Sequence, residues 1–166
     1  MAKKSVFRDF TAALRKQWKK DYPSIRPIEK PFGTFPKAST FYVGMIKDTN
    51  MHVFLNFQHS CKSLGVGRFT INVVLSSDEN NPTAGHGTRS ALDLAEGYHR
   101  IGFLVGSKDK WWHLKQDGDP ILTQAWRPSS YENTDEVILE AIDDVTRDVL
   151  STLRLLDVPV KSETST

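Results

Sequence analysis

The sequence MHVFLNFQ at residues 51–58 and the sequence RFTINVVLS at residues 68–76 decide the fold class of this chain. Both stretches alternate apolar and polar residues almost without interruption. Successive side chains of a β-strand point to opposite faces of a sheet, so a period of two predicts strands with one apolar face and one polar face. The apolar positions are Met51, Val53, Leu55, Phe57, Phe69, Ile71, Val73 and Leu75.

The neighbouring segments extend this pattern to an antiparallel meander. A strand is predicted near residues 39–46, and the polar segment KDTN that follows it is typical of a turn between antiparallel neighbours. The third strand of the meander, near 67–76, follows a glycine-containing loop. Further along the chain, Ile101, Phe103 and Val105 predict a strand near 99–105. Residues 111–114 and 121–124 are compatible with a hairpin.

Two amphipathic helices enclose the predicted strands. The first begins after Ser5 as a candidate N-cap and ends before Pro23, and the last runs from about residue 134 to residue 156. Apolar residues at spacings of three and four give each helix one apolar stripe. The stripes are Phe7, Phe10, Leu14 and Trp18 in the first helix and Ile138, Ile142, Val145, Val149, Leu153 and Leu156 in the last. The fold class is therefore α+β with a mainly antiparallel sheet, in one domain over 1–160 with a polar tail at 161–166.

Composition limits the cellular setting. Of 166 residues, 25% are charged and 39% are hydrophobic, which is the balance of a globular chain. The apolar runs are far shorter than the roughly twenty residues of a membrane span, so no membrane partner is expected. Cys61 is the only cysteine and the first residues resemble no secretory signal. We therefore expect a cytoplasmic location.

A resemblance to a known family accompanies this pattern. Residues 40–42, 55–60 and 69–73, and later 100–102 and 109–112, resemble the core of a bacterial domain-of-unknown-function family, the one numbered four-three-zero-four. The similarity covers about residues 5–126. It implies an α+β domain, and it carries no established activity or catalytic residue.

Motifs for catalysis or metal binding are weak. His59 and Cys61 are the one base and nucleophile close together in sequence, and no third orienting group is evident. The five histidines lack the spacing of a metal site, and the glycine pairs are too short for a phosphate-binding loop. We expect no cofactor and no metal. A non-enzymatic protein is the favoured interpretation, and an enzyme with an unrecognised site remains an alternative.

Two surfaces are candidates for binding. The polar sheet face would carry amides, aromatic rings and guanidinium groups, which can stack on and hydrogen-bond an unpaired base. Alternatively, a helix covers part of this face and its amides pair across strands. The second surface is the pair Trp111 and Trp112, of which a strand can easily bury only one, so that the other can anchor a partner. The sheet residues are Tyr42, Asn56, Gln58, Arg68, Asn72 and Arg100.

Charge is distributed unevenly along the chain. Residues 1–30 have a balance of +6, with Arg8, Arg15 and Lys19 on one side of the first helix, and residues 132–148 have a balance of −6. The basic and acidic helix surfaces can both be exposed to solvent and attract each other weakly. Alternatively, they can bind different partners. The favoured hypothesis is a cytosolic module that binds a protein, as immunity, antidote or phage-defence proteins do. Nucleic-acid binding by the basic helix and the sheet face is the alternative. The acidic partner surface would be Glu136, Glu140, Asp143 and Asp144.

Overall fold

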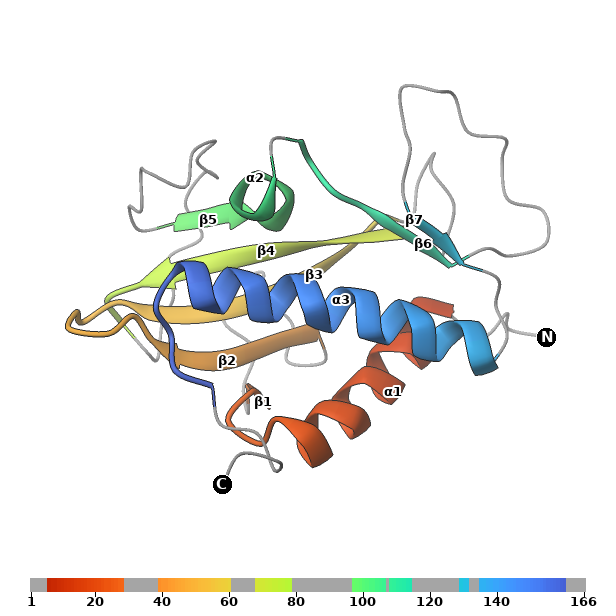
Figure 1. Ribbon diagram of the computed structural model, residues 1–166, viewed down its shortest axis with the longest axis horizontal. Coiled ribbons are helices and arrows are strands. Elements are labelled where there is room, and N and C mark those ends of the chain that lie inside the picture. Colours follow the sequence, from red (N-terminus) through yellow and green to blue (C-terminus); the bar gives the residue numbers. More distant parts are fainter. Residues whose placement is uncertain are drawn as a thin grey trace.

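The computed structural model is an α+β domain, and this confirms the fold class (Figure 1). It describes residues 6–28, 39–60, 68–78, 97–106, 108–114, 129–131 and 135–160. The described helices are α1 (Val6–Asp21), α2 (Ile101–Val105) and α3 (Asp135–Leu155). The described strands are β1 (Arg26–Pro27), β2 (Thr40–Met45), β3 (His52–Ser60), β4 (Arg68–Ser76), β5 (Gly97–Arg100), β6 (Trp112–Leu114) and β7 (Ser129–Tyr131).

The predicted meander forms the centre of the sheet. Strands β2, β3 and β4 are consecutive antiparallel neighbours, and the described strands follow the order β1-β2-β3-β4-β6-β7, with β5 also paired to β4. Strands β6 and β7 pair in parallel, so the sheet is not antiparallel throughout. Residues 121–124 of the predicted hairpin lie outside the described residues.

Helices α1 and α3 lie side by side on one face of the sheet (Figure 1). Phe10, Leu14 and Trp18 of α1 are buried against this face, as their spacing predicts. The indole Nε1 of Trp18 donates a hydrogen bond to Thr146 Oγ1 of α3 at 2.9 Å, and this joins the two helices. Neither helix is apolar over enough residues to cross a membrane.

The segment predicted as a strand over 99–105 is divided between two elements, and this corrects the prediction. Only Gly97–Arg100 is a strand, and Ile101–Val105 forms the short helix α2. Gly102 allows α2 to lie directly against the segment 108–110: a Cβ atom there would lie 2.2 Å from the Lys108 carbonyl oxygen and 2.4 Å from the Lys110 nitrogen. The tight contact involves a segment only six to eight residues further along the chain, and the alternation of apolar residues carries no sign of it.

Candidate functional site

A row of polar side chains crosses the sheet on the face opposite α1 and α3. Thr40, Asn56, Asn72 and Arg100 stand directly opposite one another on β2, β3, β4 and β5. Residues that face each other across neighbouring strands have side chains within bonding distance. Asn56 Nδ2 donates to Thr40 Oγ1 at 2.9 Å, and Asn72 Nδ2 donates to Asn56 Oδ1 at 3.3 Å.

This row is largely buried. Asn56 and Asn72 are 7% and 5% exposed, and Asn72 Nδ2 also donates to Gln58 Oε1 at 3.0 Å. The amides therefore pair across strands, as one predicted alternative holds. The helix that this alternative places over the face is not found there among the described elements, because α1 and α3 lie on the other face of the sheet. Phe54 is a buried residue of a small core on this face, and Tyr42 is partly buried beside it. The face is not an open platform of amides.

Arg100, the last residue of the row, lies beside Trp111 and Asp109. The Arg100 guanidinium lies 5.3 Å from the ring centroid of Trp111 and 3.8 Å from the Asp109 carboxylate. Trp111 Nε1 donates to Asp109 Oδ2 at 3.0 Å. Arg100 thus brings together the two surfaces that sequence analysis treated as separate.

The two tryptophans have opposite environments, as strand alternation predicts. Trp112 is fully buried and stacks on Phe69 with ring centroids 5.5 Å apart. Trp111 is partly exposed. Of the pair, only Trp111 is placed to touch a partner.

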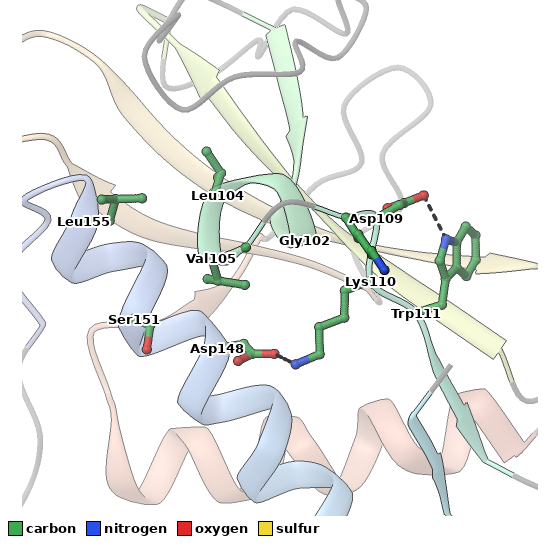
Figure 2. A pocket seen from close by; sticks show the side chains of 11 residues that line it. Gly102, Leu104, Val105, Asp109, Lys110, Trp111, Asp148, Ser151 and Leu155 are labelled. Atoms are coloured by element: carbon green, nitrogen blue, oxygen red, sulfur yellow. Dashed lines mark hydrogen bonds and ion pairs between the residues drawn. The ribbon is translucent and has the colours of Figure 1, made fainter. Parts of the chain in front are cut away.

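An open pocket with a volume of about 680 Å³ lies between α2, the segment 108–111 and α3 (Figure 2). Leu104, Val105 and Leu155 give it apolar walls, and Lys110 and Asp148 form its polar side. Val105 and Leu155 are 36% and 53% exposed. Their exposed apolar surface, at the edge of a concavity, is available for burial by a partner.

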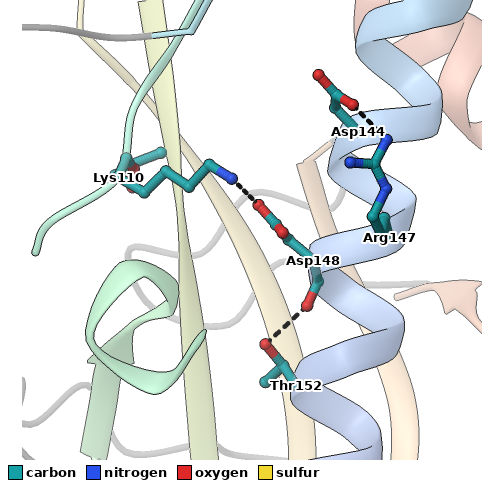
Figure 3. A network of polar contacts seen from close by, with 6 residues as sticks. Lys110, Asp144, Arg147, Asp148 and Thr152 are labelled. Atoms are coloured by element: carbon teal, nitrogen blue, oxygen red, sulfur yellow. Dashed lines mark hydrogen bonds and ion pairs between the residues drawn. The ribbon is translucent and has the colours of Figure 1, made fainter. Parts of the chain in front are cut away.

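An ion pair holds the loop side of the pocket against α3 (Figure 3). Lys110 Nζ bonds to Asp148 Oδ2, and the same ammonium lies 5.3 Å from the ring centroid of Trp112. Thr70 Oγ1 of β4 donates to the Lys110 carbonyl at 2.6 Å. The segment 108–110 is therefore fixed on three sides, by α2, β4 and α3.

The predicted charged residues lie on the outer surfaces of the helices. Arg8 and Lys19 of α1 are exposed and Arg15 is partly buried. Glu140 and Asp143 of α3 are exposed, whereas Asp144 accepts a hydrogen bond from Arg147 at 2.6 Å. Two further candidates are Glu136 of α3 and Arg68 of β4, and only their backbone is described. Arg68 stands opposite His113 of β6.

Of the residues that line the pocket, sequence analysis identifies Trp111 as a binding candidate but not Asp148 and Leu155. Asp148 and Leu155 follow Asp144 on one line of α3 at helical spacing. That spacing was a usable signal. Val105 was assigned to a strand, so its place beside α3 could not be derived.

Other predicted chemistry falls partly outside the described residues. Cys61, the candidate nucleophile, is not among them, and the side chain of His59 is not described. Within the described ranges, no group of three His, Cys, Asp or Glu side chains is arranged to hold a metal ion.

The fold and the pocket define this chain as an α+β domain with an open surface site. Comparison with protein-family models, with curated proteins and with solved structures gives no match. The resemblance to the domain-of-unknown-function family therefore stays a prediction.

Proposed function

We propose that this protein is a non-enzymatic cytoplasmic interaction module that binds a partner protein at the pocket between α2 and α3. The observation that carries the proposal is the exposure of Val105 of α2 and Leu155 of α3, both of which line that pocket. Burying such apolar area is the main source of affinity in protein association. Binding a toxin or another effector as an immunity or antidote protein is one role of this kind.

The polar groups around the pocket support binding more than chemistry. Lys110 and Asp148 satisfy each other, and the Asp109 carboxylate is engaged by Trp111 and Arg100. A general acid or base needs a group within reach of a substrate proton. Here Asp109, Lys110 and Asp148 hold the pocket wall together, so the wall is a stable surface for a partner.

Nucleic-acid binding by the sheet face has less support. Base recognition needs amides and rings that a base can reach. Asn56 and Asn72 are buried and bonded to their neighbours. Among the described side chains, this leaves Tyr42, Gln58, Arg100 and Trp111 as the accessible part. The basic side of α1 keeps this alternative testable, because phosphate contacts make binding steeply dependent on salt.

A pair of matched leucines on α3 tests the proposal. Leu155 at the pocket is 53% exposed and Leu139, away from it, is 55% exposed. Substituting an exposed leucine by aspartate has little effect on stability, so either variant reports on binding. The protein would be tagged and purified from its native cells at low and at raised salt, and co-purifying protein and nucleic acid would be quantified.

We expect a stoichiometric protein partner that remains at raised salt with the wild type and with Leu139→Asp, and that is lost with Leu155→Asp. Equal retention by both variants would place the interface elsewhere and contradict the proposal. Nucleic acid that is released by raised salt, without any protein partner, would favour the alternative.

A further inference from the structure

The pocket continues into a stripe of side chains along α3. Glu140, Asp144, Asp148, Ser151 and Leu155 follow one another at spacings of four, four, three and four residues. Residues at these spacings lie on one line of a helix. At about 1.5 Å per residue, the stripe is about 22 Å long. Its last three members line the pocket, and its first two extend beyond it.

The chemistry of this stripe changes from one end to the other. Leu155, next to the exposed Val105, makes the C-terminal end apolar. Asp148 is neutralised by Lys110, and Asp144 has Arg147 beside it. Glu140 is exposed, and no ion pair joins it to another described residue. Negative charge therefore remains at the end of the stripe away from the pocket.

Resting on the proposed function, we infer that the partner docks on this stripe with a segment that is apolar at one end and basic at the other. Its apolar side chains fill the space between Val105 and Leu155. Its lysine or arginine side chains lie about 16 to 22 Å away, beside Asp144 and Glu140, because eleven to fifteen helical residues separate these acids from Leu155.

Charge complementarity favours this occupant over a nucleic acid. At the end of the stripe away from the pocket, the exposed carboxylates of Glu140 and its neighbour Asp143 repel phosphate groups, whereas a basic protein segment gains both attraction and correct orientation there. The gradient also sets direction: a segment bound in reverse would place its basic end on Leu155 and Val105 and leave its apolar end beside carboxylates.

Peptide display tests this inference. A library of random 20-residue peptides would be selected on the wild type, on Leu155→Asp and on the double variant Glu140→Lys, Asp144→Lys. A second double variant, Asp9→Lys with Asp48→Lys, changes the net charge equally at acids that lie off the stripe and serves as the control. Affinities of selected peptides would be measured at two salt concentrations.

We expect wild-type selection to enrich peptides in which a basic cluster is separated from an apolar cluster. Their affinity should fall about tenfold or more for the stripe variant and change less than about twofold for the control, since 1.4 kcal/mol of lost attraction is a factor of ten. Enriched peptides that are apolar only, and that bind the stripe variant equally well, would overturn the inference while the proposed function stands. If selection on the wild type enriches no peptide that selection on Leu155→Asp does not also enrich, the proposed function is refuted instead.

Discussion

Replacing Gly102 by alanine sets two opposing effects against each other within α2. Alanine is the better helix former, by about 0.5 to 1 kcal/mol. Its Cβ atom, however, would lie 2.2 Å from the Lys108 carbonyl oxygen, 2.4 Å from the Lys110 nitrogen and 2.9 Å from the Asp109 carbonyl carbon. All three neighbours are backbone atoms, so no side-chain rotation can relieve the overlap.

The steric overlap should outweigh the gain in helix propensity. The segment 108–110 has to move by about 1 Å to restore an ordinary contact, and overpacking of this kind costs about 1 to 3 kcal/mol. The same movement weakens the hydrogen bond from Thr70 to the Lys110 carbonyl, which contributes about 1 kcal/mol, and displaces Lys110 from Asp148. After subtracting the gain in helix propensity, we expect a loss of about 2 to 3 kcal/mol in the free energy of unfolding.

Urea unfolding would measure this loss, and thermal unfolding should show a decrease in Tm of about 4 to 12 °C for a chain of this length. Gly106→Ala is the matched control. Among the described residues, a Cβ there meets only the Gly102 carbonyl oxygen, at 3.4 Å, so stability should change by less than about 0.5 kcal/mol. If Gly102→Ala proves as stable as the wild type or more stable, helix propensity dominates. The close contact of α2 with the loop would then not be what shapes the pocket.

Two further pairs of substitutions test buried hydrogen bonds by urea unfolding. Thr146→Val keeps the side-chain shape but leaves the fully buried Trp18 indole without its acceptor, so we expect a loss of about 1 to 3 kcal/mol. Thr152→Val, which loses only a bond to a carbonyl within its own helix, should lose less than about 1 kcal/mol, and equal losses would argue against the role of the Trp18 bond. Asn56→Ala interrupts the buried polar row and should lose about 2 to 3 kcal/mol. Gln58 is exposed and accepts one bond from Asn72 of the row, so Gln58→Ala should lose less than about 1 kcal/mol. A reversed order would show that the row is not what stabilises this face.

Sequence periodicity predicted the elements in which one repeating apolar face packs against one core. Phe10, Leu14 and Trp18 are buried as their spacing requires, and Val53, Leu55 and Phe57 face the helices as their alternation requires. In both cases one periodic face meets one core, so the pattern contains the needed information. The pocket is different, because it depends on α2 being a helix. Residues 101–105 alternate well enough to predict a strand, but they form a helix. In that helix Gly102 packs closely against the segment 108–110, and the alternation pattern contains no sign of this packing.

The polar row depends on one further feature of the backbone, a bulge in β2. Tyr42 stands opposite Phe54, whereas Gly44 stands opposite Val53, so β2 contains one extra residue between these pairs. Without it, the pairing set by the turn would place Thr40 opposite Phe57 instead of Asn56, and the apolar and polar faces of the two strands would be mismatched beyond that point.

Gly44 makes the bulge possible, because its φ of +129° is a conformation that other residues rarely adopt. A glycine inside an otherwise alternating strand is the sequence signal for such an irregularity. If the glycine is taken as a bulge, the alternation predicts that Thr40 lies opposite Asn56. It then also predicts that the amide of Asn56 bonds to its neighbours across the strands. The pairing of Thr40 with Asn56 is thus a consequence of register, and register is fixed at a glycine that the alternation pattern treats as an ordinary strand residue.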